Sequence, residues 1–132
     1  PTQFRADDEN IGRSSTNGRA EGHHYVPHAV VKELKVSDEA RKVFERVKTG
    51  KLYDLRSNRW DLYHREYSGA VKELLKEHLL KNGISPEKMT GAQAYEFLPR
   101  LFGSTDPRIK DYNIGIQMRE LAQRLYRRGG RE

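Results

Sequence analysis

The chain has 132 residues, a length typical of one domain with a single core, and none of its apolar runs approaches the roughly 20 residues that span a bilayer. Its 25 Lys and Arg outnumber its 19 Asp and Glu, so the formal charge of +6 predicts attraction to phosphate-rich partners and no membrane partner is expected. Because cysteine is absent, disulfides, thiolate zinc sites and cysteine nucleophiles are excluded, and any metal must be held by His, Asp, Glu or Asn.

The first 22 residues are rich in Gly, Ser, Asn, Asp and Arg and show no apolar periodicity. This composition is typical of a flexible arm or linker. The chain begins with Pro1 rather than Met, so we expect residues 1–22 to join a single domain, residues 23–132, to a larger precursor.

Three elements are expected in the next part of the chain. The run YVPHAVV (25–31) predicts a strand end that turns into a helix at Pro27, because proline does not fit inside a helix. Ser37 is the expected N-cap of a helix that ends near Gly50. The segment KLYDLRSN (51–58) alternates weakly and predicts a short strand or a loop.

The longest periodic stretch predicts a helix over residues 59–82, with Gly83 placed just past its end as a C-terminal cap. Thr90 precedes a further helix over 92–102, which Gly103 closes. The expected inward positions of the long helix are Trp60, Tyr63, Tyr67, Val71, Leu74, Leu75 and His78.

A last helix is expected over residues 113–128, before a Gly-Gly end. Its apolar positions are expected to face the core and its basic positions to face solvent. The predicted inward side chains are Ile114, Met118, Leu121 and Leu125; the predicted outward ones are Arg119, Arg124, Arg127 and Arg128. These elements together predict a mainly α fold.

Three of the five histidines fall within GHHYVPH (22–28), where a strand gives way to a helix. Adjacent side chains on a strand point to opposite faces, so His23 and His24 are expected to face in different directions. One can then bind a metal while the other acts as a general base, since neutral imidazole suits both tasks. His28 stands four residues after His24, but Pro27 between them argues against a helical metal-binding pair, and the role of His28 stays open.

A partner for the histidine pair is expected from the start of the long helix. His64 borders the apolar stripe, and Asp61 lies one turn before it on the same helix face. Asn58 stands just outside the predicted helix. His78 lies within the stripe and is interpreted as a packing residue.

The segments GHHYVP and HREYSGAVKELL resemble the GHH-signature branch of the HNH and endonuclease VII (His-Me finger) nucleases, over about residues 18–80. In that superfamily a small β-hairpin and a helix hold one divalent ion. The resemblance therefore implies a small β-hairpin within the mainly α fold, a ββα-metal core, and additional helices. Residues 83–132 resemble nothing identified.

Carried over residue by residue, the resemblance implies that His24 is the general base and that His23 belongs to the catalytic pair as a metal ligand. It further implies that His64 is a second ligand and that Asp61 or Asn58 completes the shell, although no Asn occupies an obvious counterpart of the middle residue of HNH. Mg²⁺ is the first expectation for the ion, with Mn²⁺, Ni²⁺ or Zn²⁺ as alternatives.

Basic side chains near the expected helix start can grip flanking phosphates, although each is equally well explained as solvated surface. On the long helix or just before it these are Arg56, Arg59, Arg65 and Lys72; in the arm they are Arg13 and Arg19.

The resemblance implies a DNase toxin at the C-terminus of a Rhs-type polymorphic protein, used in interbacterial competition. Its expected partners are DNA, the parent Rhs-type delivery protein and a cognate immunity protein, and it is expected to act in the cytoplasm of a target cell. Three alternatives stay open: an RNase with the same fold, a basic nucleic-acid-binding module that does not cut, and a protein-interaction domain in which the histidine pair is idle.

Overall fold

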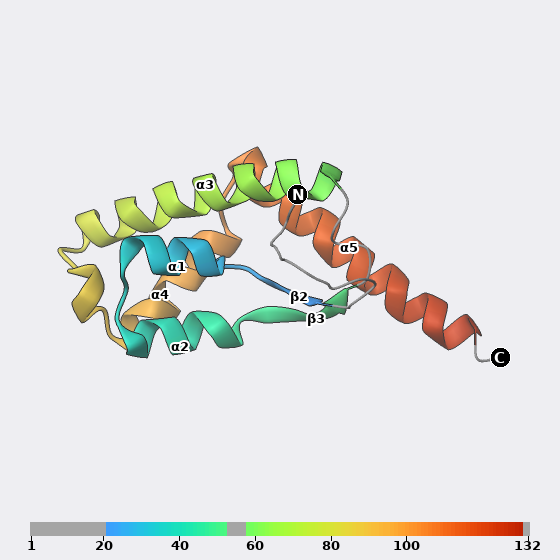
Figure 1. Ribbon diagram of the computed structural model, residues 1–132, viewed down its shortest axis with the longest axis horizontal. Helices are drawn as coiled ribbons and strands as arrows, with labels where there is room; N and C mark the ends of the chain where they lie inside the picture. Colours follow the sequence, from blue (N-terminus) through green and yellow to red (C-terminus); the bar gives the residue numbers. More distant parts are fainter. Residues whose placement is uncertain (1–20, 53–57, 131–132) are drawn as a thin grey trace.

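The computed structural model describes residues 21–52 and 58–130. The described chain is mainly helical, with one two-stranded antiparallel hairpin, and this confirms the expected mixture (Figure 1). In chain order the elements are β2 (Glu21–His24), α1 (His28–Leu34), α2 (Asp38–Arg46), β3 (Lys48–Leu52), α3 (Asn58–Lys81), the 3-10 turn η1 (Pro86–Lys88), α4 (Gly91–Phe102) and α5 (Pro107–Gly130).

The two strands pair directly with each other, although α1 and α2 lie between them in the sequence. β2 and β3 are antiparallel, Glu21 lies opposite Leu52, and His24 lies opposite Lys48, with an irregularity in the register between Gly22 and His24. β3 begins at Lys48, so the prediction that α2 continues to near Gly50 is wrong. Residues 48–52 leave the helix because they exchange backbone hydrogen bonds with β2, a non-local pairing that overrides local helix propensity.

β2 also shifts the boundary of the predicted arm. Gly22 was expected in the arm, but β2 begins at Glu21, so the end of that segment belongs to the hairpin. Residues 1–20, including Arg13 and Arg19, lie outside the described part of the chain. β2 ends at His24 and α1 begins directly after Pro27, its N-cap, so the helix starts where the change from strand to helix was predicted.

Gly22 stands at a close approach of the two hairpin backbones. A Cβ at this position would lie 2.6 Å from the carbonyl oxygen of Thr49, a backbone atom that cannot move without disturbing the pairing. We expect Gly22→Ala to lower the free energy of unfolding by about 1–3 kcal/mol, the usual cost of overpacking. Gly69→Ala on α3 is the control, because nothing lies within 4 Å of its added Cβ; it should stabilise the protein by about 0.5–1 kcal/mol. Urea unfolding of both variants checks this pair, and equal effects would contradict the steric explanation.

Local capping explains where α2 and α4 begin. The Ser37 side chain accepts a hydrogen bond from the backbone N–H of Ala40 at 3.0 Å, which confirms the predicted N-cap. Thr90 and Gln93 form a reciprocal capping box at the start of α4. α2 and α4 pack against each other, and the Phe44 and Phe97 rings meet edge to face at 6.2 Å.

α3 confirms the long predicted helix, and Gly83 follows it in the left-handed region at φ 62°, where glycine is favoured. Tyr67, Val71 and Leu75 are fully buried, whereas Tyr63 is exposed and was wrongly expected inside. Tyr63 borders an open recess beside the first turns of α5 instead. The same core also contains Val26, Val30, Val31, Ala40, Val43, Phe44, Ala70, Leu79, Met89, Ala94, Phe97, Leu101 and Ile109.

α5 departs most from expectation. It begins at Pro107 rather than at Asn113, and it buries Ile109, Asn113 and Ile116. The four side chains predicted to face the core are all exposed: Ile114, Met118, Leu121 and Leu125. α5 packs against α3 and β3, with Glu120 bonded to Gly50 of β3, and the end of α5 projects past the hairpin (Figure 1). No helix in the described ranges is both long and apolar enough to cross a membrane.

Candidate functional site

His23 is the centre of the candidate site, because its side chain is buried and it is held by hydrogen bonds from two sides. Its exposed fraction is 4%. Its backbone N–H donates to the Thr49 hydroxyl at 2.8 Å, which ties it to the neighbouring strand. Its Nε2 lies 3.2 Å from Oδ1 of Asn113, a buried residue of α5. Since the amide oxygen can only accept, this contact places the proton on Nε2 and leaves the Nδ1 lone pair available.

Aromatic rings surround the His23 imidazole. The ring centroids of Tyr25, Tyr67 and Tyr112 lie 5.0, 5.3 and 5.3 Å from that of His23. Tyr67 and Tyr112 stack on each other at 4.9 Å, and the Tyr67 hydroxyl donates to the Tyr25 carbonyl oxygen. Tyr25, which directly follows β2, thus encloses the ring together with residues of α3 and α5.

This enclosure keeps His23 uncharged at neutral pH. Burial lowers its pKa from 6.5 to about 4; the hydrogen bond to Asn113 opposes this shift, and the nearby His64 and His24 add to it. A neutral imidazole is the form that binds metal ions.

His24 faces the other side of the hairpin. It is half-buried, and its ring lies 5.9 Å from that of His28 on α1. Burial and, to a smaller degree, the neighbouring His28 and Lys48 lower its pKa, while Glu45 raises it. The predicted division therefore holds geometrically: His23 contacts α3 and α5, and His24 contacts α1. An uncharged, partly accessible imidazole at His24 can accept a proton near neutral pH.

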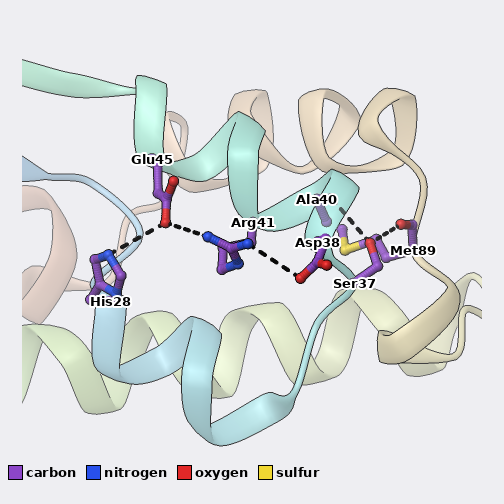
Figure 2. A network of polar contacts seen from close by, with 7 residues as sticks. All are labelled: His28, Ser37, Asp38, Ala40, Arg41, Glu45 and Met89. Carbon is purple, nitrogen blue, oxygen red and sulfur yellow. Dashed lines mark hydrogen bonds and ion pairs between the residues drawn. The ribbon is translucent and has the colours of Figure 1, made fainter.

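Figure 2 shows a chain of polar contacts on α1 and α2 that starts at His28, the neighbour of His24. His28 Nε2 lies 3.5 Å from the Glu45 carboxylate, which also accepts from Arg41 at 2.8 Å. Arg41 in turn reaches Asp38 at 3.3 Å. His28, whose role the sequence left open, is thereby held by Glu45 next to His24. The same view shows Ser37 joining the start of α2 to the carbonyl of Met89.

His64, an exposed residue of α3, lies close to His23, as predicted. The ring centroids of His64 and His23 are 6.5 Å apart, and those of His64 and Tyr112 are 6.1 Å apart. Imidazole nitrogens bind zinc at about 2.0–2.1 Å, so two rings on one ion usually lie somewhat closer, and the exposed His64 would have to turn toward His23.

The imidazoles of His23 and His64 are of the kind that binds divalent ions, but two side chains do not complete a metal site. Among the side chains that the structure describes, no group of three or more His, Asp or Glu could hold a metal ion. Asn58 and Asp61 lie on the first turns of α3, but their side chains fall outside the described set. The predicted third ligand stays a prediction.

Two of the predicted phosphate-binding side chains on or near α3, Arg65 and Lys72, are described. Arg65 is exposed on α3 directly after His64. Lys72 forms an ion pair with Glu33 of α1, so its ammonium is engaged in the fold. Arg56 and the Arg59 side chain lie outside the described part. His78 is buried and its ring packs 5.3 Å from Phe97, in agreement with the packing interpretation.

Asn113 is the site residue that the sequence analysis missed. It is separated from His23 by 90 positions, and it was taken as the first residue of the last helix. Extending that helix back to Pro107 would have placed Ile109, Asn113 and Ile116 on one face at spacings of four and three. A polar residue on an apolar face is the signal that was available. No family model matches the chain, and no curated protein or solved structure is detectably similar to it.

Proposed function

We propose that this protein is a metal-dependent endonuclease that hydrolyses phosphodiester bonds, with DNA as the first candidate substrate. One observation carries the proposal: the hairpin directs His23 and His24 to different sides, and His23 meets His64 of α3. The site therefore pairs one buried, neutral imidazole with one that is partly accessible and neutral.

His24 is the proposed general base. Its lowered pKa leaves the ring unprotonated at neutral pH, ready to take a proton from a water molecule aligned with the scissile phosphorus. Its place beside His28 and Glu45 restricts how the ring can move. The imidazolium formed in this step is close to the Glu45 carboxylate, which stabilises the added charge.

His23 and His64 are the proposed metal ligands, with Asp61 or Asn58 completing the shell. A bound divalent ion would polarise the phosphate and stabilise the leaving oxyanion. Asn113 supports this role of His23, because it fixes the tautomer and the plane of the ring from the protein side. Arg65 is near enough to the proposed ligand in sequence to bind a flanking phosphate.

The proposed biological setting is that of a toxin domain. It would be delivered by a Rhs-type parent protein into the cytoplasm of a competing bacterium and be neutralised in the producing cell by an immunity protein. The basic composition supports a polyanionic substrate and an acidic inhibitor. An RNA substrate would keep the same chemistry.

The test is incubation of the purified chain with supercoiled plasmid and, separately, with total RNA, each with Mg²⁺, Mn²⁺, Ni²⁺, Zn²⁺ or EDTA. We expect nicking and linearisation of the plasmid with at least one ion and none with EDTA. RNA loss alone would retain the mechanism and change the substrate. Binding to nucleic acid without cleavage under any of these conditions would refute the enzyme and indicate a binding module.

A further inference from the structure

An exposed apolar stripe runs along α5 from its packed part toward its projecting end. Ile114, Met118, Leu121 and Leu125 are exposed by 47, 60, 42 and 55% of their surface. Their spacings of four, three and four residues place them in one row along the helix, about 16 Å long. Such a row is the pattern of a helix that packs against another helix, and a contiguous exposed apolar patch commonly marks an interaction site.

The stripe begins at a cavity. Ile114 and Phe102 help to line a space of about 410 Å³ between the end of α4 and the first half of α5, together with Lys110, Asn113 and Gln117. Phe102 is itself half exposed. The stripe therefore starts at a recess that can accept a bulky side chain. Helices that bind in this way commonly anchor themselves with such a side chain.

The charged side chains of α5 indicate what kind of partner fits the stripe. Lys110, which lines the recess, and Arg124 are exposed basic side chains of α5. The nearby Glu120 accepts a hydrogen bond from the backbone N–H of Gly50 and so faces the hairpin. A second copy of α5 would present the same basic side chains. Nucleic acid would suit these basic side chains but would leave the Ile, Met and Leu side chains without matching chemistry.

We propose that this α5 stripe is the docking site for an amphipathic helix of a partner protein whose apolar row is flanked by Asp and Glu. The apolar row would supply the buried contact and the acidic flanks would meet Lys110 and Arg124. The inference does not rest on the proposed nuclease activity, because the stripe is separate from His24 and its test measures binding.

The probe is a synthetic helical peptide with Leu at the a and d positions of successive heptads and Glu at the flanking e and g positions. A matched peptide carries Lys in place of Glu. Binding to the full chain is followed by fluorescence anisotropy at several salt concentrations. The variants are Met118→Gln with Leu121→Gln, and Arg124→Glu. Leu80→Gln is the control, because Leu80 is an exposed leucine of α3 away from the stripe.

We expect the Glu peptide to bind and the Lys peptide to bind at least about tenfold more weakly. The double variant and Arg124→Glu should each weaken binding of the Glu peptide by about tenfold, while Leu80→Gln should leave it unchanged. Equal binding of both peptides, or of none, would overturn the proposal. A dimer that the double variant converts to monomer would assign the stripe to a second copy instead, and a loss of DNA retention in that variant would assign it to nucleic acid.

Discussion

Metal-dependent cleavage by His24→Ala should be about 10²- to 10⁴-fold slower than cleavage by the unaltered protein, the usual contribution of a positioned general base. The His24 ring is the accessible member of the pair and has a lowered pKa, whereas the His23 ring is enclosed by tyrosines. The rate of plasmid nicking with saturating ion measures this loss.

A lost base can be distinguished from a damaged fold. Added imidazole should restore part of the rate to His24→Ala, because the removed ring leaves space on the partly exposed side of the hairpin. The matched control is His78→Gln, which alters a buried histidine of the core without touching the pair. Full activity in His24→Ala, or an equal loss in a folded His78→Gln protein, would contradict the assignment.

Sequence was sufficient for the features that local chemistry determines. Ser37, Thr90 and Gly83 mark helix ends because each satisfies backbone groups within a few residues of itself. The turn from β2 into α1 at Pro27 was likewise readable, since the proline ring excludes an earlier helix start. The opposite orientation of His23 and His24 followed from strand geometry alone.

The errors arose where distant segments meet. The end of α2 was misplaced because β3 pairs with a strand more than twenty positions earlier. The apolar row of α5 was assigned to the core because periodicity shows which residues share a face and not what covers that face. Asn113 was missed for the same reason: its contact with His23 exists only after α5 has packed against the hairpin.

The buried state of His23 predicts an acid-sensitive fold. Its pKa is about 4 in the folded protein and 6.5 when the ring is fully solvated, as in the unfolded chain, so between these values the unfolded chain binds more protons than the folded one. Stability from this group is complete above about pH 7, falls as the pH drops through 6.5, and levels off below about pH 4. A difference of about 2.5 units corresponds to roughly 3 kcal/mol.

This contribution can be isolated with His23→Gln, which retains a polar side chain beside Asn113 but does not titrate. His24 and His78 also have lowered pKa values and remain in the variant, so their effects cancel in the difference. Urea unfolding in EDTA, which removes any metal contribution, should show the unaltered protein losing roughly 3 kcal/mol more than the variant between about pH 7 and about pH 4. Parallel curves would mean that His23 is protonated as readily in the folded protein as in the unfolded chain. The enclosure by Tyr25, Tyr67 and Tyr112 would then be open to water, and the neutral imidazole that metal binding requires would not be secured by the fold.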